Sequence, residues 1–421
     1  MSWSYSIVGL LLLILIHELG HFVVARLVGA KATRFLVGFP PVALSFRRGE
    51  TEYGLGFIPL GGYVRIVGMS RPQASDVIIC QDALEELTVR RRDGQREIFG
   101  PAVSVLKSRL DAGGDDARVA AERALLGLDA EQDLLHPKTY QETRRGLERL
   151  RDDLDRRAYW RLAVWRRIAI VAAGPAANVL AAIVILSVFF WHGVPLEKTT
   201  TEVGVVSGKP ALAAGLQPGD SIVGVNGTRV AGNWELVTST VQASQGSPIV
   251  LRISRGGVER ALPAVRPEAV DGRWLLGFSA QRVSNGVRTE PPLQAIGSAF
   301  SWSWFVTRES LIGLKNIVVT EDGHRQVSSI VGITAASEES VQQGSFLWTL
   351  GVISLALAIF NLLPFLPLDG GHILVAAIEK LRRGRPLSRL VMERVSIVGI
   401  VLMLALFLIG LSNDIGRFTG P

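Results

Sequence analysis

The sequence predicts a polytopic α-helical membrane protein with four transmembrane helices, a membrane-associated β-hairpin region and an inserted extracytoplasmic α+β domain. Three observations lead to this fold class. Of the 421 residues, 48% are hydrophobic and only 20% are charged, and the mean hydropathy of +0.30 is high for a soluble chain. Four apolar runs are long enough to cross a bilayer, which takes about 20 residues. The 45 Lys and Arg residues outnumber the 38 Asp and Glu residues, and they cluster beside these runs, as positive charge does in membrane proteins.

The four apolar runs are almost free of charge. The first run, Tyr5 to Ala25, contains one acid, Glu18, and no charged residue occurs in the other three, which are Ile168 to Trp191, Ser345 to Leu368 and Val395 to Asn413. Such long uncharged runs are rare in the cores of soluble domains. The first run lacks a basic n-region and a small-residue cleavage site, so it does not resemble a cleavable signal peptide. The predicted transmembrane helices are 1–32, 163–192, 345–371 and 394–413.

The basic residues give the orientation of these helices. They follow the first span, precede the second span, and lie between the third and fourth spans. The positive-inside rule then places 26–167 and 369–394 in the cytoplasm and both termini outside. We therefore expect a multi-pass protein of the cell inner (plasma) membrane, with the single cysteine, Cys80, on the reducing side.

The connecting segments differ in composition. Aromatic, Gly and Pro residues in 33–69 favour hairpins, and the segment is too apolar for a solvated loop, so we expect it to associate with the membrane. Mixed-sign charge in 70–162 predicts a solvated, cytoplasmic helical insertion, with a regulatory module as the alternative. Segment 291–344 is predicted to be interfacial and amphipathic, because it mixes aromatic and basic residues: Trp302, Trp304, Phe305, Arg308 and Lys315.

Residues 202–267 are predicted to form a compact β-rich unit on the outer side. Asn226-Gly227 is a hairpin signal, and 249–253 alternate as a strand does. The segment resembles a PDZ domain in the residues Pro210-Ala211, Ala214-Gly215-Leu216, Pro218-Gly219-Asp220 and Val225-Asn226-Gly227. PDZ domains accept a peptide as an added strand. The resemblance leaves two roles open: peptide capture, or a spacer that restricts access to the membrane domain.

The first span contains a metal-binding pattern. His17 and His21 are spaced i, i+4 and share one helix face, where both can bind one metal ion, while Glu18 can reach a metal-bound water. A carboxylate inside a span costs about 2.5–3.5 kcal/mol, so Glu18 is a functional candidate. A catalytic zinc usually has three protein ligands. Asp369 follows a proline-broken stretch at a similar predicted depth and is the expected third ligand, with His372 as its competitor.

These motifs resemble the site-two proteases, which are zinc intramembrane metalloproteases. The resemblance rests on His17-Glu18-Leu19-Gly20-His21, Asn361-Leu362-Leu363-Pro364, Leu368-Asp369-Gly370-Gly371, Pro59-Leu60-Gly61-Gly62-Tyr63-Val64 and Ala173-Gly174-Pro175-Ala176-Ala177-Asn178. With the PDZ-like insertion, the sequence is similar to the bacterial branch that cleaves anti-sigma factors, such as the regulator of sigma-E protease. The resemblance implies that Asn361 and Pro364 hold the substrate backbone, and that the hairpin residues Gly61, Gly62 and Tyr63 pair with unwound substrate.

The predicted function is hydrolysis of a peptide bond in or near the transmembrane segment of a single-pass protein. One Zn²⁺ per chain, held by His17, His21 and Asp369, would activate water, and Glu18 would act as the general base. The resemblance implies an anti-sigma factor-like substrate after a first cleavage; membrane lipid is the other expected partner, and no nucleic acid is expected. Two alternatives are a PDZ-containing scaffold with a structural zinc site and a membrane-anchored cytoplasmic zinc endopeptidase.

Overall fold

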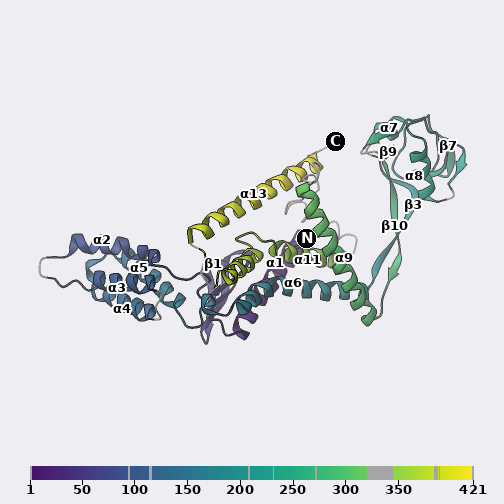
Figure 1. Ribbon diagram of the computed structural model, residues 1–421. Helices are drawn as coiled ribbons and strands as arrows, with labels where there is room; N and C mark the ends of the chain where they lie inside the picture. Colours follow the sequence, from purple (N-terminus) through teal and green to yellow (C-terminus); the bar gives the residue numbers. More distant parts are fainter. Residues whose placement is uncertain are drawn as a thin grey trace. The chain divides into compact units, whose positions relative to one another are not determined.

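The computed structural model describes residues 2–92, 95–112, 116–206, 209–230, 232–270, 273–319, 345–383, 387 and 389–419 (Figure 1). The chain divides into two compact units. The first comprises Met1–Leu186 with the described parts of 299–341 and 346–414, and the second is centred on Ser187–Ser298.

Three helices of the described chain are long and apolar enough to cross a membrane. Their apolar segments are Ile7–Leu27, Val164–His192 and Val391–Ile415. They belong to α1 (Ser2–Leu27), α6 (Val164–His192) and α13 (Arg389–Thr419). They correspond to the predicted spans 1–32, 163–192 and 394–413, although α1 ends at Leu27, before the end of the first of these.

The predicted third span, 345–371, is not one continuous helix. The helix α11 covers only Phe346–Asn361, and a new helix, α12, covers Asp369–Leu381. At a rise of 1.5 Å per residue, the 16 residues of α11 reach about 24 Å, which is shorter than a bilayer core. Pro364 and Pro367 lie between the two helices, where their missing N–H groups and ring clashes prevent a helix from continuing. Asp369 is therefore the first residue of a helix instead of the end of a span.

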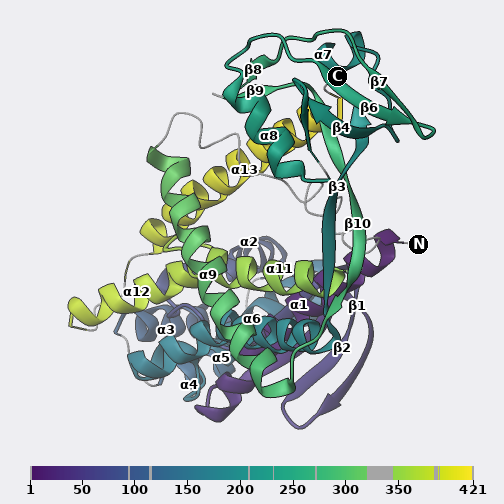
Figure 2. The same ribbon diagram turned by 90° about the vertical axis from the view of Figure 1, so that its right-hand side faces the viewer.

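Small residues let α1, α6 and α11 pack closely together (Figure 2). A Cβ on Gly9 of α1 would lie 2.9 Å from Leu350 Cδ1 of α11, and a Cβ on Gly351 of α11 would lie 2.7 Å from Leu186 Cγ of α6. Gly20 of α1 likewise faces the backbone of Ala173 in α6. Close approach at small residues is how helices associate without a hydrophobic driving force.

A two-stranded β ribbon packs along α1. It consists of β1 (Ala32–Arg48) and β2 (Thr51–Ile66) in antiparallel pairing. Phe35 of β1 pairs with both Val64 and Tyr53 of β2. The two ends of β2 therefore lie on opposite sides of β1, and the ribbon folds on itself. Apolar side chains stay exposed on it, including Leu44, Phe46 and Phe57 at 64–70%. Such exposed apolar surface marks a membrane or protein contact.

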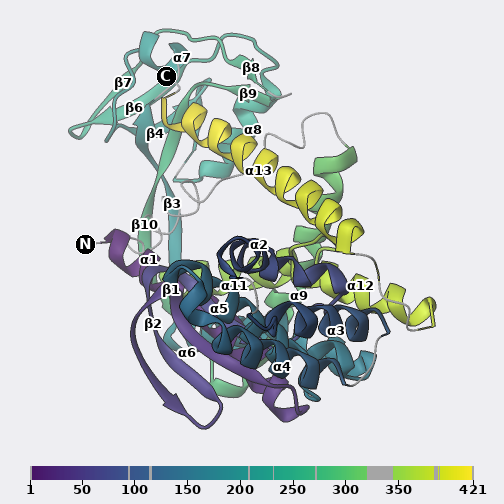
Figure 3. The ribbon, with the colours of Figure 1, turned by 90° about the vertical axis from the view of Figure 1, so that its left-hand side faces the viewer.

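The charged segment 70–162 forms a helical bundle with its own hydrophobic core (Figure 3). Phe99, Leu106, Leu128 and Leu147 are fully buried there. Its single cysteine is also buried, and burial raises the pKa of Cys80 to about 12. The helical elements are η1 (Ala74–Cys80), α2 (Gln81–Arg90), α3 (Phe99–Asp111), α4 (Ala117–Ala130), η2 (Gln132–Leu134), α5 (Pro137–Asp153) and η3 (Tyr159–Arg161).

Polar contacts connect the end of this bundle to both ends of the ribbon. The Gly68 amide donates to Asp153 Oδ1 at 2.9 Å, and Lys31 Nζ donates to Asp155 Oδ2 at 2.9 Å. Burial alone would raise the pKa of Asp155, but hydrogen bonds from the Arg157 amide and Lys31, together with the charges of Lys31 and Arg118, hold the pKa below its usual range.

The second unit contains a six-stranded sheet. Its order is β10-β3-β4-β6-β7, with β5 paired to β4, and β8 pairs with β9 separately. The long strands β3 and β10 form a ribbon that leads into the smaller strands (Figure 1). The strands are β3 (Val194–Val206), β4 (Ser221–Val225), β5 (Thr228–Arg229), β6 (Leu251–Arg255), β7 (Val258–Ala261), β8 (Glu268–Val270), β9 (Arg273–Leu275) and β10 (Phe278–Arg288), with helices α7 (Lys209–Ala213) and α8 (Trp234–Ala243).

The second unit extends beyond the predicted range 202–267 on both sides. The start of β3 and all of β8–β10 lie outside that range. Inside it, Asp220 is 1% exposed and accepts a hydrogen bond from Arg255 Nη2 at 2.6 Å. Burial alone would raise the pKa of Asp220, but this ion pair and the Gln217 amide hold it below its usual value.

The helix α9 covers Pro292–Val319 and accounts for the first half of the predicted interfacial segment 291–344. It carries Trp302, which contacts Trp348 of α11 edge to face at a ring distance of 4.8 Å. Residues 320–344 of that prediction lie outside the described residues.

Candidate metal centre

The helix α1 brings two imidazole rings to one point. His17 and His21 are one turn apart, and their Nε2 atoms lie 3.1 Å from each other with the rings at 84°. His17 is 8% exposed. Two nitrogens aimed at the same place form half of a tetrahedral metal site.

Asp369 completes the group from α12. Its Oδ2 lies 3.1 Å from His17 Nε2 and 3.3 Å from His21 Nε2. The turn after α11 folds back onto the start of α12, because Gly370 and Gly371 have no side chains to hold the preceding backbone away. Within the described residues, His17, His21 and Asp369 form a group whose ligand atoms all lie within 4.8 Å of one another.

The donor set fits zinc. At a zinc–ligand distance of 2.0–2.1 Å, neighbouring ligands of a tetrahedral site are about 3.3 Å apart, and the observed separations are 3.1–3.3 Å. Within the described part of the chain, Asp369 Oδ2 is buried and accepts no hydrogen bond. A buried carboxylate oxygen without a donor is costly, and a cation between it and the two nitrogens removes that cost.

Helix α6 supports the two histidines from behind. His21 Nδ1 lies 2.8 Å from the carbonyl oxygen of Ile170, which accepts its proton and leaves Nε2 free for a metal. Gly174 faces both rings: a Cβ there would lie 2.7 Å from His17 Nε2. Asn178 is fully buried, and its side-chain amide lies 3.3 Å from His17 Nδ1. The two hydrogen-bond contacts from this helix are thus made to the Nδ1 atoms of the rings and not to the Nε2 atoms.

Glu18 lies between the metal group and β2. A Cβ on Gly62 would be 2.6 Å from Glu18 Cγ, so only a glycine lets the strand approach this closely. The backbone of Val64 is a hydrogen-bond partner of the Glu18 carboxylate. Glu18 is half-buried and is not a member of the metal group. A carboxylate in this position can exchange a proton with water at the metal without ligating the metal.

The other predicted site residues lie on β2, at the end of α11 and in the turn that follows it. Gly61 faces Ile14 of α1, 3.5 Å from its would-be Cβ, and Tyr63 pairs with Leu36 across the ribbon. Asn361 ends α11, where its Nδ2 donates to the Leu357 carbonyl oxygen at 3.0 Å. Pro364 is exposed in the turn that follows.

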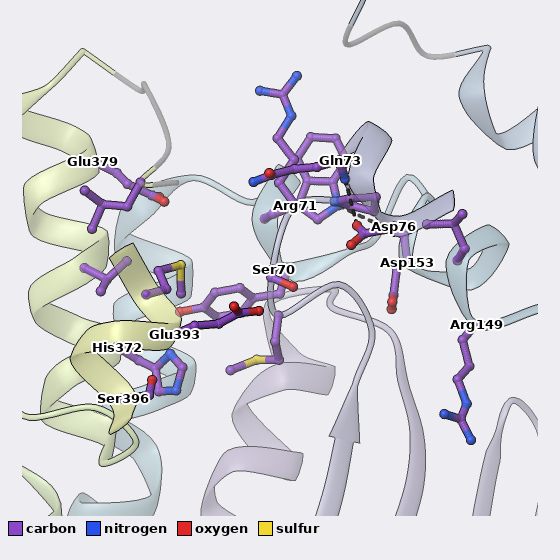
Figure 4. Close-up of a pocket in the computed structure, with 18 of the residues that line it drawn as sticks. Ser70, Arg71, Gln73, Asp76, Arg149, Asp153, His372, Glu379, Glu393 and Ser396 are labelled. Atoms are coloured by element: carbon purple, nitrogen blue, oxygen red, sulfur yellow. Dashed lines mark hydrogen bonds between the residues drawn. The ribbon is translucent and has the colours of Figure 1, made fainter. Parts of the chain in front are cut away.

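His372 lies one turn after Asp369 but is not in the metal group. Its side chain projects into a neighbouring cavity of about 830 Å³ (Figure 4). The cavity is bordered by the helical bundle, α12 and α13, and includes Tyr159, Arg167 and Glu379. Arg167 donates to Glu379 at 2.6 Å, and both side chains are nearly buried, so this pair joins α6 to α12 beside the metal group.

Sequence reasoning missed the roles of Ile170, Gly174 and Asn178. Gly174 and Asn178 belong to a motif that carries the family resemblance, but the sequence predicted no role for them at the site. Their i, i+4 spacing places them on one face of a helix, as His17 and His21 are on α1. A small and a polar residue on one face of an otherwise apolar span is the signal that points to them.

The chain is similar to a peptidase family and to bacterial proteases. Peptidase family M50 matches residues 5–406. The zinc metalloprotease RasP of Geobacillus kaustophilus is 29% identical over 433 residues, covering 96% of each chain. The regulator of sigma-W protease RasP of Bacillus subtilis is 27% identical and covers 96% of each chain, and the metalloprotease MmpA of Caulobacter vibrioides is 28% identical and covers 96% of this chain and 92% of its own.

All three relatives are named as proteases: the first name specifies a zinc metalloprotease, the second a regulator of sigma-W and the third a metalloprotease. A peptidase family that matches almost the whole chain favours an enzyme over a scaffold with a structural zinc site. Long apolar helices and a buried two-histidine, one-carboxylate centre are the features that such a membrane protease needs. The chain therefore belongs to peptidase family M50, the site-two proteases, and is a zinc metalloprotease.

Proposed function

We propose that this protease cleaves a single-pass membrane protein in or near its transmembrane segment, with His17, His21 and Asp369 as zinc ligands and Glu18 as the general base. One observation carries the proposal: the metal group, the Glu18 carboxylate and the Gly62 backbone of β2 meet beside one apolar helix. A protease site of this kind needs an activated water and an extended substrate in the same place.

When bound, zinc supplies Lewis-acid chemistry that polarises the scissile carbonyl and makes water a better nucleophile. Glu18 accepts the proton of the attacking water and passes it to the leaving amine. The ribbon carries the substrate: an unwound segment pairs with the backbone of β2 near Gly61, Gly62 and Tyr63, as strands are added to sheet edges elsewhere. Asn361 and Pro364 hold the other side of the substrate backbone.

The proposed substrate is an anti-sigma factor-like regulator that has already been cut once outside the membrane. The Bacillus subtilis relative is named a regulator of sigma-W protease, which supports a membrane-bound regulator as the substrate class. Four spans are part of the proposal: α11 and the turn after it together serve as the third, with 26–167 and 369–394 in the cytoplasm according to their basic residues.

Within this proposal the second unit is a PDZ-like domain outside the membrane that restricts access. Its sheet and the helix α8 support the resemblance in architecture. A site on the cytoplasmic side cannot be contacted by an outer domain, so the unit acts before the substrate span enters. A folded substrate ectodomain is excluded and a trimmed one is admitted.

Glu18→Gln tests the general base. The amide is nearly isosteric but cannot accept the proton, so co-expression with a single-pass anti-sigma reporter should show no cleavage, while the purified variant retains one zinc per chain. The matched control is Glu122→Gln, at an exposed acid on α4, which should cleave as the wild type does. Appreciable turnover by Glu18→Gln would remove the general-base assignment.

A further inference from the structure

Asn178 is a buried polar residue in an apolar helix, and among the described residues one of its two side-chain polar atoms lacks a hydrogen-bond partner. It is fully buried in α6, and within the described chain its Oδ1 has no hydrogen-bond partner. The hydrogen bond of its side chain that the structure shows is the one between Nδ2 and His17 Nδ1, at 3.3 Å. An unsatisfied buried oxygen costs about 1–3 kcal/mol, so its presence calls for a partner that appears in another state.

That state is the one in which His17 binds zinc. A neutral imidazole that ligates through Nε2 carries its proton on Nδ1, and this proton needs an acceptor. Rotation of the Asn178 amide by half a turn exchanges its oxygen and nitrogen in nearly the same space. Oδ1 then accepts from His17 Nδ1, and the oxygen that lacked a partner is satisfied.

We propose that Asn178 is a positioning residue for the metal centre, which selects the His17 tautomer that binds zinc through Nε2. The two histidines differ in this respect. His21 Nδ1 faces the Ile170 carbonyl, which can only accept, so its tautomer is set by the backbone. His17 faces an amide that can either donate or accept, so its tautomer depends on a side chain.

A second contact holds Asn178 in place. Ser354 Oγ of α11 donates to the backbone carbonyl oxygen of Asn178 at 2.8 Å, and both residues are fully buried. The helix that carries Asn178 is thereby tied to the helix whose end leads to Asp369. This hydrogen bond adds to the Arg167–Glu379 pair, which joins α6 to α12.

The inference rests on His17, His21 and Asp369 being the zinc ligands. The experiment separates a failure of this ligand set from a failure of the role given to Asn178. Zinc affinity is measured on the purified full chain by competition with a chelator, and Co²⁺ replaces zinc to give an absorption spectrum of the ligand field. His17→Ala should lose metal. If His17→Ala keeps wild-type affinity, the ligand set fails, whatever Asn178 does.

Asn178→Leu fills the same space without polar atoms, and it should weaken zinc binding by about 10–100-fold, which is typical when a partner of a ligating histidine is removed. Asn178→Asp retains an acceptor and should restore the affinity and the Co²⁺ spectrum. The thermal midpoint of the metal-free chain should change little in Asn178→Leu, because the variant removes the unsatisfied buried Oδ1 together with one hydrogen bond to His17.

The matched control is Asn233→Leu, which removes the amide that caps α8 through the Leu236 amide at 3.2 Å. It should leave zinc affinity unchanged. Three results would overturn the inference: wild-type affinity in Asn178→Leu, no rescue by Asn178→Asp, or a lower midpoint of the metal-free Asn178→Leu chain with unchanged metal binding.

Discussion

A single methyl group at Gly174 should abolish metal binding without unfolding the protein. An ideal Cβ at this position would lie 2.7 Å from His17 Nε2 and 2.6 Å from His21 Cε1, and closer still to His21 Nε2. These two nitrogens are the proposed ligand atoms. Gly174→Ala therefore places a carbon atom where the metal and its ligands need to be.

The size of the effect follows from these distances. Ordinary van der Waals contact begins at 3.4 Å, so His17 Nε2 or the helix must retreat by about 0.7 Å from its 2.7 Å contact. Metal–ligand distances hold within about 0.2 Å of their usual values, so the shift breaks the coordination. We expect zinc affinity to fall at least about 100-fold, at the upper end of what losing a ligand's support costs. The helix itself should not suffer, because Ala is favoured over Gly by about 1 kcal/mol within helices.

The assay is metal content and chelator competition on the purified chain, with thermal unfolding in the presence of excess chelator as the measure of the fold. The matched control is Gly297→Ala, since this glycine of α9 has nothing within 4 Å of its would-be Cβ. It should bind one zinc as the wild type does. One zinc per chain with unchanged affinity in Gly174→Ala would refute the placement of α6 against the two histidines.

Four further predictions follow from the structure. Asp369→Ala should lose most of the zinc, because two histidines alone leave the site incomplete; full retention, measured by metal analysis, would reassign the third ligand. In a chain whose native cysteine is replaced by alanine, a cysteine at exposed Asn233 should react with an impermeant thiol reagent on intact cells and one at exposed Glu122 should not; the reverse pattern would invert the topology. The folded-state pKa of Asp220 is lower than its unfolded-state value of about 3.9, so its contribution to stability is present above that value and is lost as pH falls through the folded-state pKa. Hydrogen exchange at β4 should therefore accelerate on acidification below about pH 4 in the wild type and show a weaker pH dependence in Asp220→Asn. Replacing 207–277 by a short turn between the paired residues Val206 and Phe278 preserves the β3–β10 ribbon, and it should allow cleavage of untrimmed substrate; loss of cleavage of trimmed substrate would favour peptide capture instead.

Some of these features could be predicted from local sequence. Three of the four predicted spans coincide with long apolar helices, because a run of about 20 apolar residues needs no distant partner to be recognised. The pairing of His17 with His21 follows from helical periodicity alone. The break before Asp369 follows from two prolines. The helix α11 stops at Asn361, earlier than the end of the predicted span 345–371.

Other features depend on packing between distant segments. The charge of 70–162 predicted solvated helices, and their shared core around Phe99 and Leu147 became evident only from how the helices assemble. The second unit includes strands outside 202–267 because Val194–Val206 of β3 pairs with Phe278–Arg288 of β10, and pairing of this kind has no local signal.

The metal centre shows the same division most clearly. The residue types and their spacing on each segment determined that His17, Glu18, His21 and Asp369 were candidates for zinc chemistry. Only the tertiary structure decided that Asp369 Oδ2 lies 3.1 Å from His17 Nε2, that Gly174 leaves room for the rings, and that Asn178 faces His17. These contacts join helices far apart in the chain. Their geometry depends on how closely the glycines of α1 and α6 let the helix backbones approach, and no single segment encodes that distance.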